Sequence, residues 1–141
     1  MSSLSSHETP PVLRLGFIIG ALYGASGVIL GALASHLPEN AFAVANGRNI
    51  LHTAVEMMMW HAIILCSLSL KPRLLNQTIL KYTVSCFCIG ITLFCFPVIS
   101  FALWDLKISV FSIARVAPYG GSLLILAWLL TAFSALKKDQ H

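Results

Sequence analysis

Residues 50–70, ILHTAVEMMMWHAIILCSLSL, decide the fold class of this chain. They form one of four long apolar runs, and Glu56 and His61 lie well inside this one. An ionisable side chain in a segment of membrane-spanning length costs free energy unless a partner offsets the cost, so it marks a candidate functional position. The run therefore predicts a membrane span and singles out two residues within it.

The composition extends this interpretation to the whole chain. Of the 141 residues, 57% are hydrophobic and only 10% are charged, whereas soluble domains carry about 25% charged residues. So few charges cannot cover a soluble surface, which predicts the lipid bilayer as the main partner and a single membrane domain. The net charge of +4 forms no basic patch, because Lys and Arg lie between the apolar runs. Nucleic-acid binding is therefore not expected.

The four runs predict an all-α fold, a four-transmembrane-helix bundle, with room for short interfacial helices in the first and third loops. Each run is long enough to cross a bilayer. A disordered polar tail is expected at residues 1–12, followed by one membrane domain over residues 13–138. The expected spans cover about residues 13–33, 50–70, 79–103 and 118–136.

The first run also fits a secretory signal peptide when it is considered alone. Arg14 precedes an apolar stretch that ends in Ala32-Leu33-Ala34, which matches an A-x-A cleavage pattern. The stretch exceeds the usual length of about 7–15 residues, and it can span a bilayer. We therefore expect an uncleaved first helix.

Basic residues divide unequally between the two ends of such a bundle. Three of them, Arg48, Lys107 and Arg115, fall in the first and third loops. By the positive-inside rule, this asymmetry predicts an inner (plasma) membrane protein with both termini in the cytoplasm. The other end holds six basic residues: Arg14, Lys71, Arg73, Lys81, Lys137 and Lys138.

Five glycines follow one face of the first run. At 3.6 residues per turn they fall within an arc of about 80°, and such a stripe lets another helix backbone approach closely. One interpretation is packing inside the chain's own bundle. The other is a groove for a membrane-protein partner, a second copy or a lipid-like ligand. The glycines are Gly16, Gly20, Gly24, Gly27 and Gly31.

Glu56 has a structural interpretation as well as a functional one. His52 lies four residues earlier on the same helix face and could pair with it. The sequence Thr53-Ala54-Val55-Glu56 also fits a capping box, which would make Thr53 the N-cap and place Glu56 near the headgroups. We expect this second arrangement.

His61 lies near mid-span and cannot pair well with Glu56, which is about 140° away around the helix. Its expected partners are the Tyr23 phenol, backbone carbonyls freed by Pro97, or hydroxyls such as Ser26, Thr92 and Ser100. A neutral, hydrogen-bonded core histidine is one interpretation. The other interpretation is that His61 binds or transfers a proton, or binds a lipid or a quinone-like ligand.

No cofactor and no metal are expected. His36 and His52 both fall near the membrane surface, so no second mid-membrane histidine accompanies His61 as a haem ligand. Four cysteines (Cys66, Cys86, Cys88 and Cys95) lie inside apolar runs without zinc-site spacing.

Three blocks of the sequence resemble one family in order along the chain. They are the segment GASGVILGALASH at residues 24–36, Thr53-Ala54-Val55 followed by Trp60-His61-Ala62, and Pro118-Tyr119-Gly120-Gly121 followed by Trp128. They are similar to the domain of unknown function 423 family, small integral membrane proteins that include the YgdD-like proteins and a relative, transmembrane protein 256. The resemblance implies a four-helix inner-membrane protein and marks His36 and His61 as family positions, but it implies no reaction.

Two function classes follow from these observations. The first, which we favour, is a non-catalytic scaffold or accessory membrane subunit that docks through the glycine face. The second is a protein that binds or translocates a proton, lipid or quinone-like ligand at His61. An enzyme is not expected.

Overall fold

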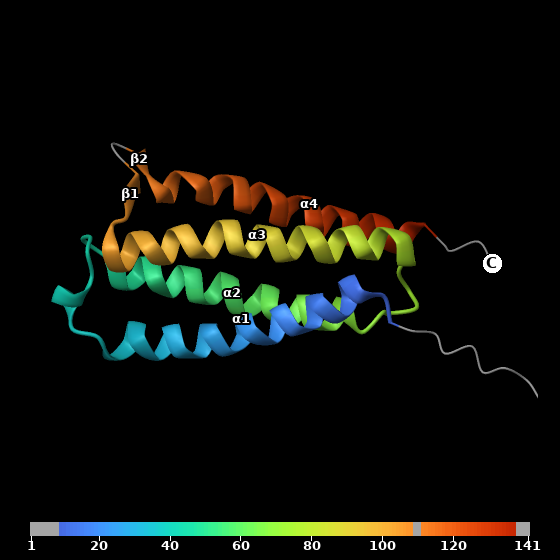
Figure 1. The fold of residues 1–141 in the computed structure, drawn as a ribbon, viewed down its shortest axis with the longest axis horizontal. Coiled ribbons are helices and arrows are strands. Elements are labelled where there is room, and N and C mark those ends of the chain that lie inside the picture. The colour runs from blue at the N-terminus through green and yellow to red at the C-terminus, as the bar shows by residue number, and fades with distance from the viewer. Residues whose placement is uncertain (1–8, 109–110, 138–141) are drawn as a thin grey trace, which may run out of the picture.

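The computed structural model describes residues 9–108 and 111–137. Four long helices run up and down and pack side by side as a bundle (Figure 1). The sequence-based prediction of an all-α four-helix bundle is therefore confirmed. The helices are α1 (Pro11–His36), α2 (Gly47–Ser69), α3 (Gln77–Trp104) and α4 (Ala117–Leu136).

The core lies between α2 and α3, the two central helices. Helix α1 packs mainly on α2 and helix α4 mainly on α3 (Figure 1). Phe87 of α3 is the largest of the fully buried side chains, and it belongs to a mainly aliphatic core cluster. The other fully buried members include Leu65, Leu80, Val84 and Ile91.

The helix ends follow local sequence signals that extend beyond the apolar runs. Pro11 occupies the first turn of α1, a position that suits its fixed φ and missing N–H. Helix α1 thus begins at Pro11, inside the polar tail that we expected over residues 1–12. Residues 1–8 of that segment lie outside the described part of the chain. The Asn76 side chain accepts a hydrogen bond from the Ile79 N–H at 3.1 Å and caps α3. These signals make α1 and α3 longer than the hydropathy pattern alone suggests.

The first loop is short and is tied to α2 by one arginine. It contains a single 3₁₀ turn at Glu39–Ala41, in the loop where a short interfacial helix was expected. The Arg48 Nε lies 2.6 Å from Glu39 Oε1, and its terminal nitrogens donate to the carbonyls of Ala34 and Leu37. Arg48 thereby supplies donors to carbonyls at the end of α1, which the helix itself cannot satisfy.

The third loop forms a small hairpin followed by a short 3₁₀ helix. Two-residue strands, β1 (Lys107–Ile108) and β2 (Phe111–Ser112), pair antiparallel. A 3₁₀ turn at Ile113–Val116 then leads directly into α4. The hairpin ends the bundle on the same side as the first loop (Figure 1).

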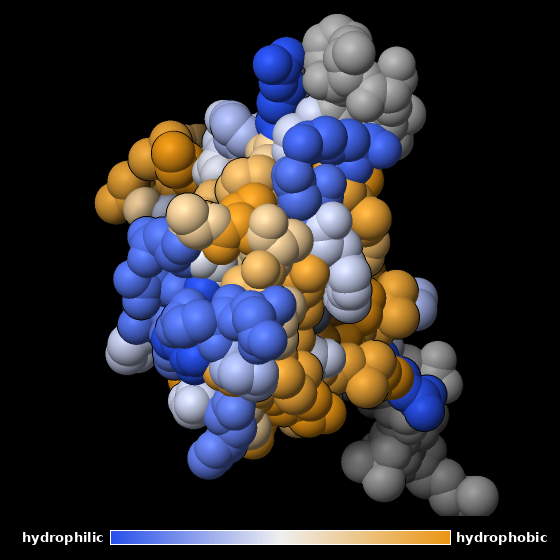
Figure 2. Space-filling model, turned by 90° about the vertical axis from the view of Figure 1, so that its left-hand side faces the viewer, coloured by the Kyte–Doolittle hydropathy of each residue, from blue (hydrophilic) through white to orange (hydrophobic). Residues whose placement is uncertain are grey.

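The outer surface of the bundle is apolar along its length. Each of the four helices contains an 18-residue window with a mean hydropathy of at least 1.4, and no more than 39% of any window is buried inside the described structure. Polar residues gather at the end formed by the first and third loops, with apolar side chains around them (Figure 2). Helices with a largely exposed apolar surface suit a bilayer, because their backbone groups form hydrogen bonds within each helix and need no water.

Candidate functional site

His61 is buried in the bundle and both of its ring nitrogens have partners. Its side of α2 faces α3 and α4, and the residue is 7% exposed. Nδ1 lies 2.6 Å from the Met57 carbonyl oxygen, one helical turn earlier. The Trp128 indole N–H donates to Nε2 from α4 at 3.4 Å. Because a carbonyl only accepts and an indole only donates, these contacts assign a neutral imidazole with its proton on Nδ1.

An aromatic cluster completes this arrangement and joins three helices. The His61 and Trp128 rings are 6.3 Å apart at 68°, and Phe87 lies 5.6 Å from Trp128 at 88°. Edge-to-face geometry at these distances is favourable for aromatic pairs. His61 therefore meets packed side chains from α3 and α4 rather than an open cavity.

The partners of His61 are not the ones that the sequence suggested. Tyr23 and Thr92 bond each other instead, and the Tyr23 phenol also donates to the Cys88 carbonyl at 3.4 Å, so they link α1 to α3. Trp128 follows His61 by 67 residues, and periodicity within one helix cannot reveal such a contact. The available signal was chemical, because a partly buried indole N–H needs an acceptor.

Glu56 lies on the outer face of α2, and the capping-box prediction is wrong. Helix α2 begins at Gly47 behind Asn46, which adopts a left-handed φ of 64°. Thr53 is therefore inside the helix, where its hydroxyl donates to the Asn49 carbonyl at 3.1 Å. Glu56 follows Gly47 by about 14 Å of helix rise, and its side chain is exposed. Glu56 thus lies in the third turn of α2 rather than in its first turn.

The remaining ionisable candidates do not gather around Glu56. In residues 9–108 and 111–137 the ion pairs are Arg48–Glu39 and Lys107–Asp105, so the pairing of His52 with Glu56 that the sequence allowed is not formed. His52 is half-buried on α2, and His36 is exposed in the last turn of α1. The described part of the chain holds no group of three His, Cys, Asp or Glu residues arranged to bind a metal ion.

Three of the five glycines are packed inside the bundle, Gly16 against both α2 and α3, and Gly20 and Gly27 against α2. A Cβ at Gly16 would lie 2.4 Å from Val84 Cγ1 and 2.8 Å from Ser69 Oγ. At Gly20 it would lie 3.2 Å from the Ala62 carbonyl oxygen, and at Gly27 2.5 Å from Met59 Sδ. The glycines therefore permit the close approach of α1 to α2.

The other two glycines have more space. A Cβ at Gly31 would make an ordinary 3.5 Å contact with Val55, whereas one at Gly24 would meet nothing within 4 Å. Gly24 opens onto a shallow groove of about 300 Å³ between α1 and α2 on the outside of the bundle. The groove is lined by Gly20, Ala21, Gly24, Met59, Ala62, Ile63, Cys66 and Ser67.

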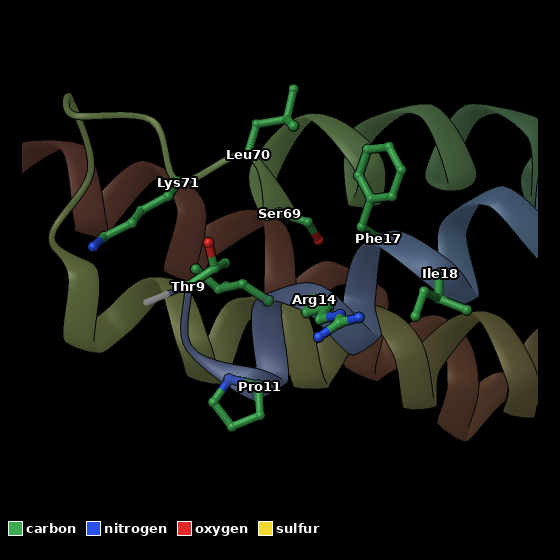
Figure 3. A pocket seen from close by; sticks show the side chains of 9 residues that line it. Thr9, Pro11, Arg14, Phe17, Ile18, Ser69, Leu70 and Lys71 are labelled. Atoms are coloured by element: carbon green, nitrogen blue, oxygen red, sulfur yellow. The ribbon is translucent and has the colours of Figure 1, made fainter. Parts of the chain in front are cut away.

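A larger pocket of about 1000 Å³ lies at the end of the bundle where α1 begins and α2 ends (Figure 3). Arg14 and Lys71 are the charged residues in its lining. The sequence indicated a role for them only in setting the orientation of the protein in the membrane. Its other lining residues are Thr9, Pro11, Leu13, Phe17, Ile18, Ser69 and Leu70.

Four long apolar helices packed as a bundle define a multi-pass membrane protein with four candidate spans. The chain belongs to the family described as protein of unknown function (DUF423), whose model matches residues 30–121, more than half of its length. This confirms the resemblance seen in the sequence. The matched region includes His61 and Glu56 but not Trp128. No curated protein and no solved structure matches the chain.

Proposed function

We propose that this chain is a non-catalytic accessory subunit that binds a transmembrane helix of a partner protein on the outer face of α2. The observation that carries this proposal is the exposed carboxyl of Glu56 within the membrane-spanning part of α2. Ionisable side chains inside membrane spans normally face a bundle interior or an aqueous cavity and have a partner. Glu56 faces outward, so the partner is expected on another chain.

The residues around Glu56 have the spacing of a helix-binding seam. Thr53, Glu56, Trp60, Ile63 and Ser67 are all exposed and recur at alternating intervals of three and four residues. This 3–4 spacing keeps one stripe facing a neighbouring helix that crosses at a shallow angle. We call these five residues the outer α2 face.

The hydroxyls of the outer α2 face are satisfied within the helix, whereas the carboxyl is not. Thr53 donates to the Asn49 carbonyl and Ser67 donates to the Ile63 carbonyl at 2.8 Å. Glu56 belongs to neither of the ion pairs formed among the described residues. Charge complementarity therefore favours a partner helix with a lysine or arginine at this depth. A second copy would instead place two carboxyls near each other.

The open groove beside α1 supports the same docking face. Ile63 and Ser67 belong both to the outer α2 face and to the groove around Gly24. A side chain from the partner helix could enter the groove while its basic residue approaches Glu56. This changes the docking surface expected from the sequence, because Gly16, Gly20 and Gly27 pack against the chain's own side chains.

The alternative centred on His61 has no specific observation in its favour. Its two nitrogens are engaged by Met57 and Trp128, and aromatic rings pack around it. A ligand or a transferred proton would have to displace one of these contacts. We therefore retain the non-catalytic subunit, in the inner membrane with both termini in the cytoplasm, as the proposed function.

The test uses site-specific photocrosslinking of the full chain in native membranes. A photoreactive residue at Trp60, 69% exposed on α2, should capture a partner span that carries a basic residue. The same probe at Ile125, 64% exposed on α4, is the matched control and should not capture it. Glu56→Lys should abolish the crosslink from position 60, and a basic-to-acidic change in the captured span should restore it.

Three outcomes would contradict the proposal. Equal capture at both positions would show general lipid-facing proximity rather than a docking face. An unchanged crosslink in Glu56→Lys would remove the role of the carboxyl. Capture of a second copy of this chain would replace the hetero-partner by a homo-oligomer.

A further inference from the structure

The pocket at the start of α1 has a positive charge that no described residue neutralises. Arg14 and Lys71 line it, and its lining contains no acidic side chain. Neither residue is part of an ion pair formed within residues 9–108 and 111–137. Arg14 is exposed and Lys71 is half-buried. Figure 3 shows their side chains extending toward opposite sides of the pocket, so a bound anion would draw the flexible lysine toward the arginine.

The same pocket has an apolar wall. Phe17 and Ile18 are 44% and 48% exposed on α1, and Leu70 is 72% exposed at the end of α2. Figure 3 shows Arg14 between the start of α1 and Ser69, with Phe17 and Ile18 further along α1. Since α1 crosses the bilayer from this end, a ligand that follows the wall passes from the charged mouth toward the hydrocarbon. The pocket is therefore amphipathic in the direction of the membrane normal.

We propose that this pocket binds the headgroup of an anionic phospholipid, with the phosphate between Arg14 and Lys71 and an acyl chain along Phe17 and Ile18. Arginine and lysine are the side chains that proteins use most for phosphate. Basic pockets between transmembrane helices recognise anionic headgroups in the same way. A free phosphate would satisfy the two cations but would leave the apolar wall without an occupant. The wall therefore favours the lipid.

This proposal is independent of the partner helix on the outer α2 face. Ser69, at the pocket, follows Glu56 by thirteen residues, which corresponds to about 20 Å of helix rise. Loss of lipid binding would leave the docking proposal intact, and the reverse also holds.

The test measures lipid binding to the purified full chain in a zwitterionic detergent. Phosphatidylglycerol and phosphatidylcholine are titrated separately, and bound lipid is counted by native mass spectrometry. We expect phosphatidylglycerol to bind preferentially. The double variant Arg14→Gln/Lys71→Asn should bind it roughly ten- to thirty-fold more weakly, since each basic side chain near an anionic lipid contributes to binding. Asparagine is chosen at position 71 because Lys71 has a left-handed φ of 58°, which asparagine tolerates.

Arg73→Gln is the matched control, because Arg73 is exposed in the same loop but does not line the pocket. It should bind phosphatidylglycerol as the wild type does. Circular dichroism and size exclusion verify the fold of each variant. Should the double variant not fold, the single variant Arg14→Gln decides the same question, since its side chain is exposed.

Soluble competitors separate the lipid from a free anion. Inorganic phosphate and glycerol phosphate should not displace phosphatidylglycerol from the wild type at millimolar concentration. Displacement by either would assign the site to a free phosphate and overturn the lipid. Equal affinity for the two lipids, or unchanged affinity in a folded variant that lacks Arg14 or both cations, would also overturn the proposal.

Discussion

At the scale of single residues, His61 stabilises the bundle through two hydrogen bonds and an aromatic cluster. His61→Ala would leave the Trp128 N–H without its acceptor and open a cavity beside Phe87. Both effects destabilise, so we expect the free energy of unfolding to fall by about 2–4 kcal/mol. Unfolding of the purified chain in a detergent titration measures it.

His61→Phe separates the two contributions. It keeps a ring in the cluster and removes only the hydrogen bonds, so the loss should be about 1–2 kcal/mol. A His61→Ala variant with unchanged stability but altered proton flux or ligand binding in liposomes would contradict the core interpretation. It would return His61 to the list of functional residues.

At the scale of elements, Gly120 permits the close approach of α4 to the backbone of α3. A Cβ at Gly120 would lie 2.3 Å from the backbone nitrogen of Phe94, whereas one at Gly121 would lie 3.7 Å from the Phe94 ring. Backbone cannot yield as a flexible side chain can, so α4 would have to move away from α3.

This contact predicts opposite results for two neighbouring substitutions. Gly120→Ala should destabilise the bundle by about 1–3 kcal/mol, while Gly121→Ala should be neutral or slightly stabilising because alanine favours helix. Thermal unfolding of the two variants side by side makes the comparison. Equal effects would mean that α3 and α4 do not approach as closely as described.

The α1–α2 interface allows a similar comparison within the glycine stripe. Gly20→Leu should disrupt the bundle, because a side chain there meets the Ala62 carbonyl and the Cys66 backbone nitrogen at 3.2 Å. Gly24→Leu should leave stability unchanged, since Gly24 faces the open groove. Loss of monodispersity in size exclusion detects the first effect. If Gly24→Leu also weakens partner capture at Trp60, the groove contributes to docking.

The sequence alone did not predict which glycines of the stripe accept a larger side chain and which do not. The stripe itself followed from the helical period, but its contacts depend on which side chain of α2 or α3 lies opposite each glycine. The same limit applies to Glu56. Its position in the helix depended on where α2 begins, which is at Gly47 rather than after Thr53. The sequence predicted the four spans because hydropathy is local, whereas the His61–Trp128 contact arises only from tertiary packing.

At the scale of the whole molecule, the bundle places the start of α1 and the end of α4 at one end (Figure 1). Of the basic residues in the described chain, Arg14, Lys71, Arg73, Lys81 and Lys137 lie toward that end. Arg48, Lys107 and Arg115 lie toward the other. Lys138 falls outside the described residues. The positive-inside rule then predicts that the end with both termini is cytoplasmic.

A pair of reporter fusions tests this orientation. A reporter that fluoresces only in the cytoplasm should be active after Lys137 and inactive when inserted at Asn40, an exposed residue of the first loop. The reverse pattern would invert the protein and place the Arg14–Lys71 pocket in the opposite leaflet. The cytoplasmic leaflet is the one rich in anionic lipid. With the termini in the cytoplasm, the Arg14–Lys71 pocket faces that leaflet, which is consistent with the lipid proposal. Neutralising the five described basic residues of that end together leaves Lys138 against Arg48, Lys107 and Arg115, so it should invert the reporter pattern. Neutralising Arg14 and Lys71 alone leaves four against three and should leave the pattern unchanged.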